Sequence, residues 1–228
     1  MNQENRPIRS YVLRQGRISK AQQTAFETLM PKYGLAFQRG FLALDEVFVR
    51  QAPKILEIGF GMGDSTARMA LENPEKDYLA IEVHTPGVGS LLKLVEEKHL
   101  SNVRIIQHDA VEVLENMIPD GSLSGAHIFF PDPWPKKRHH KRRLIQSELI
   151  GLLCRKLEIG GYIHAATDWE EYAAHILNVL EKEPMLSNSA AGYSERPAYR
   201  PLTKFEERGI RLGHGVRDII FKKIRAGK

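Results

Sequence analysis

The feature of this sequence that most restricts its fold is the alternation of short apolar runs with helix-compatible stretches. We predict strands at residues 54–59, 78–83, 103–109, 126–130 and 161–166. Helix-compatible stretches lie at about 65–72, 87–99, 110–118, 143–157 and 169–182. Strands that alternate with helices build βαβ units, and these give a parallel sheet covered on both faces. We therefore expect an α/β fold whose ligand sites lie beyond the carboxyl ends of the strands.

Composition and length favour a single globular unit. The chain has 228 residues, of which 42% are hydrophobic and 27% charged, and this length can bury roughly 70% of the unfolded surface. The single cysteine, Cys154, excludes an internal disulfide and a cysteine-cluster metal site. No run approaches the roughly 18 apolar residues of a membrane span, and the N-terminus lacks the apolar core of a signal peptide. We expect a soluble, cytoplasmic protein.

The net charge of +5 is unevenly distributed along the chain. Residues 1–50 carry +4, residues 51–131 carry −6, and residues 132–228 carry +7. One surface cannot attract both polyanions and cations. The pattern therefore indicates two kinds of partner, one for the acidic middle and one for the basic flanks.

Three successive strand ends in the acidic middle carry residues suited to a nucleotide cofactor. The first strand runs into Gly59-Phe60-Gly61-Met62-Gly63, and glycines let a backbone turn tightly and approach a ligand closely. Glu82 ends the second strand near the spacing at which an acid meets ribose hydroxyls. Asp109 ends the third strand, where its carboxylate or the neighbouring backbone can reach an adenine. Each has a plainer interpretation: an ordinary turn, a solvated strand end or a helix cap.

The charges around the glycine turn favour S-adenosylmethionine over NAD. A dinucleotide fingerprint has Gly or Ala three residues after Gly61, but this chain has Asp64, which would face a pyrophosphate unfavourably. S-adenosylmethionine has no phosphate and carries a sulfonium cation. An acidic pocket that includes Glu57, just before the glycines, would suit that cation.

A proline-rich segment with many cations follows the fourth strand. It reads PDPWPKKRHHKRR over residues 131–143, and its three prolines predict a stiff, irregular loop. The loop would hold Asp132 and Trp134 at the predicted catalytic edge, where a nucleobase could be hydrogen-bonded and stacked. The cations that follow favour phosphate binding over a merely solvated face. Two adjacent histidines without a third partner do not predict a metal site.

The remaining candidates lie in the C-terminal third. Thr167-Asp168-Trp169 ends the fifth strand and repeats the pairing of a carboxylate with an aromatic ring, although Asp168 could instead cap the next helix. The segment 201–209 (PLTKFEERG) is polar with mixed charges, and residues 216–221 predict a last strand.

The motifs LEIGFGMGDS, PDPWPKKRHHKRR, TDWEEYA and TKFEERGIRLGHGVRD closely resemble the bacterial tRNA (guanine-N7-)-methyltransferases over roughly residues 50–222. The resemblance implies a Rossmann-like class I methyltransferase fold, a seven-stranded, mostly parallel sheet with one antiparallel strand at one end. It also implies methyl transfer from S-adenosylmethionine to N7 of guanine 46 in the tRNA variable loop, without a metal. We divide the chain into a basic extension with a helix, residues 1–50, which either contacts RNA or is flexible, and a methyltransferase domain, residues 51–228.

The resemblance assigns roles to individual residues. The cofactor site would comprise Glu57, Gly59, Gly61, Glu82, Asp109 and Asp132, and Asp132 would also be catalytic. The target guanine would be contacted by Lys136, Asp168, Thr203, Lys204, Phe205 and Glu206. The RNA backbone would be contacted by Arg138, His139, His140, Lys141, Arg142 and Arg143. Phe60 stands where many relatives carry a smaller residue, which affects the shape of the pocket beside the cofactor.

Guanine N7 has a lone pair and no proton, so the predicted tasks are alignment and charge placement rather than deprotonation. We expect Asp132 and Asp168 to hold the base through its donor edge or its developing positive charge. Three alternatives remain: an amino-group methyltransferase acting on adenine or cytosine, a non-catalytic RNA-binding protein, and an NAD oxidoreductase. The sequence does not distinguish a monomer from a homodimer.

Overall fold

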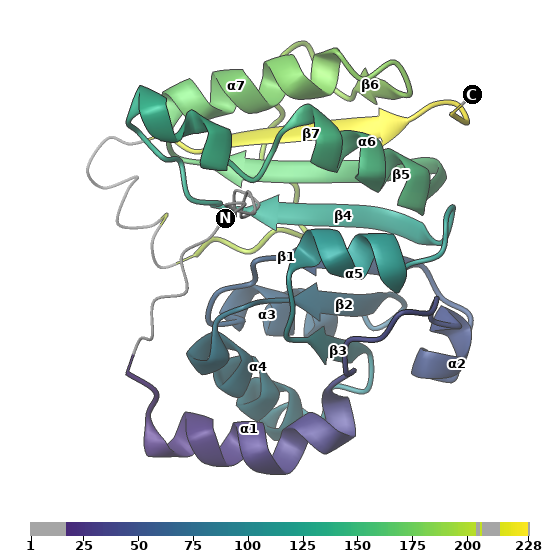
Figure 1. Cartoon of the computed structure of the whole chain (residues 1–228), viewed down its shortest axis with the longest axis vertical. Helices are drawn as coiled ribbons and strands as arrows, with labels where there is room; N and C mark the ends of the chain where they lie inside the picture. The colour runs from purple at the N-terminus through teal and green to yellow at the C-terminus, as the bar shows by residue number, and fades with distance from the viewer. Residues whose placement is uncertain (1–16, 204–205, 207–214, 228) are drawn as a thin grey trace, which may run out of the picture.

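The computed structural model describes residues 17–203, 206 and 215–227, and within them one sheet lies between two layers of helices (Figure 1). The strand order is β3-β2-β1-β4-β5-β7-β6. Among these described strands, β7 runs in the direction opposite to the other six. The strands are β1 (Lys54–Ile58), β2 (Asp77–Ile81), β3 (Val103–Ile106), β4 (Leu123–Phe129), β5 (Leu157–Thr167), β6 (Leu186–Asn188) and β7 (Arg217–Lys223).

The helices cover both faces of the sheet. Successive residues of a strand point to opposite faces, so Ile55 packs in one apolar cluster with α1, α3 and α4, and Leu56 packs in the other with α5, α6 and α7. The helices are α1 (Lys20–Tyr33), α2 (Leu44–Phe48), α3 (Asp64–Glu72), α4 (Thr85–Glu97), α5 (Ala110–Asn116), the 3₁₀ helix η1 (Lys137–Arg142), α6 (Ser147–Lys156) and α7 (Glu170–Glu181). None of these described helices has the length and hydropathy of a membrane span.

The fold prediction is confirmed, including the mostly parallel sheet and the antiparallel strand near one end. The antiparallel strand β7 is second from the edge, because the three-residue strand β6 pairs with its outer side. Strand β6 was not predicted, since three residues are too few to show a periodic pattern. The segment after β4 also differs from the prediction. Its prolines end at Pro135, and the following residues form η1 rather than an irregular loop.

The described part of the first fifty residues packs onto the sheet domain. Helix α1 begins with a capping box between Ser19 and Gln22, and the side chains of Lys32 and Tyr33 bond Glu96 of α4. After α1, the amide of Leu35 donates to the carbonyl of Ile105 at 2.8 Å. The predicted helix of this region is therefore present, and it lies against β3 and α4.

Candidate active site

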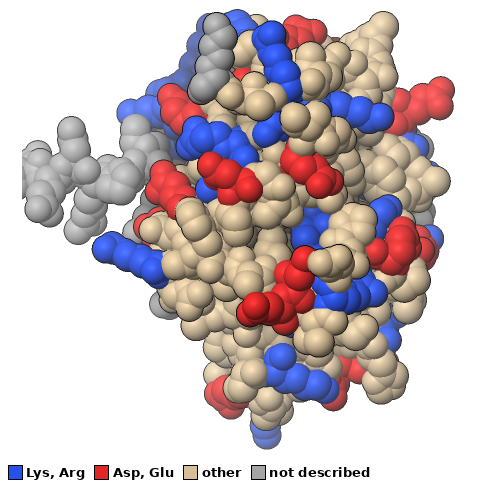
Figure 2. Space-filling view, turned by 90° about the vertical axis from the view of Figure 1, so that its right-hand side faces the viewer, with Lys and Arg blue, Asp and Glu red and all other residues tan. Residues whose placement is uncertain are grey.

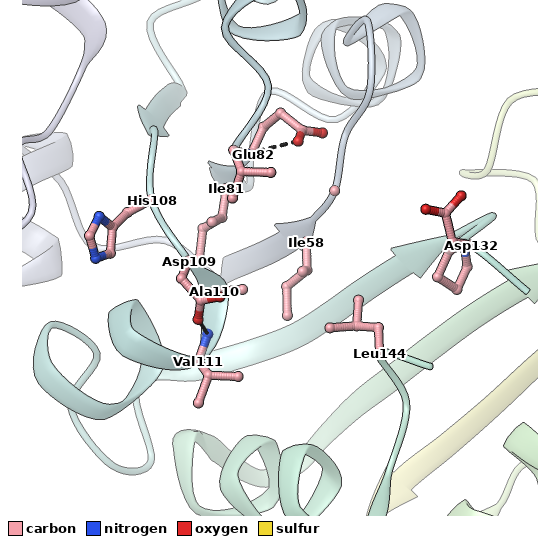
Figure 3. Close-up of a pocket in the computed structure, with 12 residues that line it drawn as sticks. Ile58, Ile81, Glu82, His108, Asp109, Ala110, Val111, Asp132 and Leu144 are labelled. Carbon is pink, nitrogen blue, oxygen red and sulfur yellow. Dashed lines mark hydrogen bonds between the residues drawn. The ribbon is translucent and has the colours of Figure 1, made fainter. Parts of the chain in front are cut away.

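A pocket opens beyond the carboxyl ends of β1 to β4 (Figure 3). Its walls are apolar, and three carboxylates stand around it: Glu82, Asp109 and Asp132. The apolar residues come from several strand ends and from the chain after η1; they are Ile58, Ile81, Val83, Ala110, Val111 and Leu144. Such a pocket suits a ligand with an apolar body and a few polar or cationic groups.

The glycine turn after β1 is shaped by close backbone contacts. Gly61 has a φ of +58°, a conformation that favours glycine. A Cβ on Gly87, in the first turn of α4, would lie 2.1 Å from the carbonyl oxygen of Gly61. The turn is therefore pressed against the start of α4, and Gly59 lines the pocket directly.

Glu82 is bound to this turn. Its carboxylate accepts hydrogen bonds from the amide of Gly61 at 3.0 Å, of Val83 at 2.8 Å and of His84 at 3.1 Å. A carboxylate has about four acceptor positions, so capacity for a ligand hydroxyl remains. The predicted cofactor residues Gly59, Gly61 and Glu82 are thus brought together.

Asp109 is both a pocket residue and the N-cap of α5. Its Oδ1 accepts from the amides of Val111 at 2.9 Å and Glu112 at 3.2 Å. The helix cap considered from the sequence is therefore present. It fixes the carboxylate at the pocket rim, where the neighbouring backbone also faces the cavity.

Glu57 is buried one residue before the pocket wall. Burial raises the pKa of its carboxyl to about 7, and the nearby negative charge of Glu82 acts in the same direction. The hydroxyl of Thr66 acts in the other direction and partly offsets this rise in pKa, although Oε2 of Glu57 has no well-aligned hydrogen-bond partner among the described residues. Glu57 is 2% exposed and is not one of the residues that line the pocket, so its carboxyl lies behind the pocket wall in this structure.

The loop after β4 carries Asp132 to the pocket from the opposite side (Figure 3). Two non-glycine residues of this loop have left-handed backbones: Phe130 with φ +51° and Trp134 with φ +45°. Such conformations persist only where the surroundings impose them. Here Nε of Arg143 donates to the carbonyl of Pro133 at 2.9 Å and fixes the loop from behind.

The structure divides the predicted RNA-binding run. Arg138 and Lys141 are exposed, whereas His139, His140 and Arg142 are half-buried. The guanidinium of Arg142 lies 5.2 Å from the ring centre of Trp134. Arg143 is the exception to the prediction: it is buried and holds Pro133 and Glu171, so this structure does not present it to phosphates.

The predicted guanine-binding residues lie at the same edge of the sheet. Lys136 is exposed just before η1, and Asp168 is exposed at the end of β5 without capping α7. Thr203 and Glu206 bond each other: the amide of Thr203 donates to Oε2 of Glu206 at 2.9 Å, and the amide of Glu206 donates to Oγ1 of Thr203 at 3.1 Å. The predicted residues Lys204 and Phe205 lie outside the described residues.

Sequence reasoning missed a buried polar network under this edge, made by His164, Tyr199, Arg200 and Asp218. The available signal was a histidine, His164, in the largely apolar second half of β5.

Known proteins similar to this chain indicate its family. A family model described as "Putative methyltransferase" matches residues 51–219. The tRNA (guanine-N(7)-)-methyltransferase of Nitrosospira multiformis is 65% identical over 96% of this chain and 96% of its own length. That of Methylobacillus flagellatus is 62% identical, over 96% of this chain and 92% of its own.

Solved structures support the fold alone. A 30S ribosomal A1408 methyltransferase from an uncultured bacterium superposes with a TM-score of 0.57 at 15% identity, covering 79% of this chain and 92% of that one. Precorrin-6y C5,15-methyltransferase from Geobacter metallireducens gives 0.52 at 16% identity, covering 79% and 87%. Both share the class I methyltransferase architecture. The family match and the sequence identities together show that this chain belongs to the tRNA (guanine-N7-)-methyltransferase family.

Proposed function

We propose that the protein transfers the methyl group of S-adenosylmethionine to N7 of a guanine in tRNA, at position 46 of the variable loop. The observation that carries this proposal is the position of Asp132. Its loop stands between a carboxylate-rimmed pocket and the exposed cations of η1. A methyl donor and an RNA base can therefore meet at this residue.

Six residues would hold the cofactor. Five lie on one side of the pocket, namely Glu57, Gly59, Gly61, Glu82 and Asp109, and Asp132 lies on the opposite loop. When bound, S-adenosylmethionine supplies an electrophilic methyl group on a sulfonium. Glu82 and Asp109 are already fixed by backbone amides, so they offer oriented acceptors at little further cost in entropy. Glu57 lies behind the pocket wall, where its carboxyl would stabilise a cationic ligand through space rather than by direct contact.

Asp132 and Asp168 would hold the guanine. The attacking nitrogen needs no base, since it carries a lone pair, but the ring becomes cationic as the methyl group arrives. Exposed carboxylates at the ends of β4 and β5 can bind the donor edge of the base and stabilise the developing charge. Lys136 and Thr203 lie at the same edge of the sheet, where they would make further contacts with the substrate.

The tRNA backbone would contact the cations of η1, above all Arg138 and Lys141, whose side chains are exposed. Phosphate contacts of this kind position the RNA and make binding salt-dependent. We also propose the division of the chain into a basic N-terminal extension, residues 1–50, and a methyltransferase domain, residues 51–228. Because tRNA is the proposed substrate, the proposed site of action is the cytoplasm.

The direct test incubates the pure protein with unmodified tRNA transcript and methyl-labelled S-adenosylmethionine, followed by nucleoside analysis. We expect label in 7-methylguanosine, and none in a transcript that carries adenine at position 46. Label in an amino-methylated adenosine or cytidine would assign a different methyl transfer. Cofactor binding without transfer to tRNA would leave a binding protein.

A further inference from the structure

The most deeply buried cation among the described residues lies outside the pocket. Arg200 is 2% exposed and sits between two carboxylates that are themselves buried. Its Nε and Nη2 donate to Oδ1 and Oδ2 of Asp218 at 2.6 and 2.8 Å. Its Nη1 lies 2.7 Å from Oε1 of Glu206. One guanidinium thus joins the last strand, β7, to the segment that begins at Thr203.

The Asp218 end of this bridge is fixed to the centre of the sheet. Nε2 of His164, on β5, donates to Oδ1 of Asp218 at 2.7 Å, and the hydroxyl of Tyr199 donates to Nδ1 of His164 at 2.9 Å. Burial lowers the pKa of His164, in agreement with a neutral ring that donates on one side and accepts on the other. Asp218 is therefore a rigid anchor.

The Glu206 end of the bridge shapes the predicted guanine-binding segment. Both carboxylate oxygens of Glu206 are engaged within the protein, Oε1 with Arg200 and Oε2 with the amide of Thr203. The side chain of Glu206 is nearly inaccessible, with 1% exposed. These contacts hold the Glu206 side chain in place, and neither of its carboxylate oxygens faces a base in this structure.

Arg200 also lies against the start of the Asp132 loop. The centre of its guanidinium is 5.9 Å from the ring of Phe129 and 5.7 Å from the ring of Phe130. Phe130 has the left-handed backbone that turns the chain toward Pro131 and Asp132. The side chain of Arg200 therefore contacts both Glu206 and the start of the Asp132 loop.

We propose that Arg200 is a positioning residue, which sets Glu206 and the bonded Thr203 relative to the Asp132 loop so that a guanine fits between Thr203 and Asp132. The inference rests on the proposed function. A buried ion pair is weak as a source of stability, because removing its members from water offsets their attraction. Its value here is geometric: the forked pair with Asp218 fixes direction as well as distance, and a single ion-pair contact holds Glu206 to the same guanidinium.

The test compares Arg200→Gln with Arg50→Gln. Arg50 is a matched control, because it forms an arginine–aspartate pair with buried Asp77 at the opposite end of the sheet. We expect Arg200→Gln to lower kcat for tRNA methylation at least about tenfold, since small displacements of reacting groups cost this much or more. The KM for tRNA should change less than about threefold, since the exposed cations of η1 are untouched. Cofactor affinity measured by calorimetry should be unchanged, because the pocket contains none of the bridge residues.

The outcomes separate the two proposals. A wild-type chain that forms no 7-methylguanosine overturns the proposed function and this inference with it. If the wild-type chain forms 7-methylguanosine and the Arg200→Gln variant has the same kcat, only the inference is overturned. An equal loss of kcat in Arg50→Gln also overturns it, because the effect would then be one of general stability. If Arg200→Gln does not fold, Asp218→Asn breaks the same bridge at its anchor, and unchanged kcat in that variant is again contrary to the proposal.

Discussion

Two buried carboxylates at opposite ends of the sheet are treated in opposite ways. Asp77 begins β2, is fully buried, and is contacted by both Arg50 at 2.6 Å and Lys54 at 3.2 Å. Glu57 lies near the end of β1, is also buried, and forms no ion pair with the described residues. The first carboxylate is neutralised by two cations of the protein, and the second is not.

Other charged side chains at the two ends of the sheet also differ in their pairing. At the amino ends of the strands, Lys54 pairs with Asp45 and Lys156 with Asp120, and Figure 2, which views the molecule from that side, shows cationic and acidic side chains interspersed. At the carboxyl ends, Asp132 and Asp168 are exposed and form no ion pair with the described residues. The comparison teaches that charges at the amino ends are paired within the protein, while at the carboxyl ends two exposed carboxylates stay unpaired beside ion pairs such as Arg143 with Glu171.

The largest expected effect is on stability, from Lys54→Met at the amino end. This change removes a buried cation from Asp77 and should lower the free energy of unfolding by about 3 kcal/mol, the lower end for breaking a buried pair, because Arg50 remains. Denaturant unfolding measures the loss. The rate of methyl transfer per folded molecule should be unchanged, and a slower rate would break the comparison.

Glu57→Gln should have the opposite effect on stability. Burial raises the pKa of Glu57 from 4.5 to about 7, so the folded chain binds a proton more tightly than the unfolded chain does. Stability is therefore lost as the pH rises through this range. The ionised group costs on the order of 3 kcal/mol, and we expect the variant to regain about 2 kcal/mol of this at pH 8, because a buried amide also lacks partners.

Unfolding at pH 5 and pH 8, without cofactor, checks this prediction. The advantage of the Glu57→Gln variant should shrink at pH 5, where the wild-type carboxyl is largely protonated. Parallel pH profiles for the two proteins would show that Glu57 is ionised and satisfied in the folded state.

Asp132→Ala should reduce turnover at least about tenfold at saturating S-adenosylmethionine, because a carboxylate beside the developing positive charge is lost. Its melting temperature should stay close to wild type, since the side chain is exposed. Asp120→Ala is the matched control: another exposed acid, at the amino end, where it pairs with Lys156. Near wild-type turnover in Asp132→Ala would remove this residue from the reaction.

The smallest effect is on the salt dependence of tRNA binding. Replacing Lys137, Arg138 and Lys141 by Gln should lower the slope of log Kd against log salt by about 2 to 3, following the coefficients of roughly 0.7 to 0.9 per phosphate contact. A control variant replaces the exposed cations Arg68, Lys93 and Lys182 on α3, α4 and α7. Equal slopes in the two variants would place the RNA elsewhere.

The parallel part of the fold was predictable because each central strand is buried on both faces and appears as a continuous apolar run. The residues at the strand ends, such as Glu82 and Asp109, were predictable for the same reason, since the position of a strand end follows from the run before it. Their bonding was only partly predictable: a helix cap was one interpretation of Asp109, and the folded chain shows that Asp109 both caps α5 and lines the pocket.

Burial of charge was the main feature that the sequence concealed. Arg143 belongs to a run of cations, yet its side chain is buried under the loop. His164 and Asp218 are 54 residues apart and meet across β5 and β7. The linear pattern shows His164 as a polar residue in an apolar run, but it gives no indication of the partner, because the pairing of β5 with β7 is decided only on folding.

The position of β7 has a consequence for the protein during its synthesis. The pocket is built from residues between Ile58 and Leu144, whereas the anchor of the Arg200 bridge, Asp218, belongs to the last strand. Translation releases the N-terminal part first. A growing polypeptide therefore has all the pocket residues long before it can order the segment that faces the guanine. If the Arg200 bridge positions the guanine, methyl transfer therefore requires that β7 has been synthesised and paired with β5.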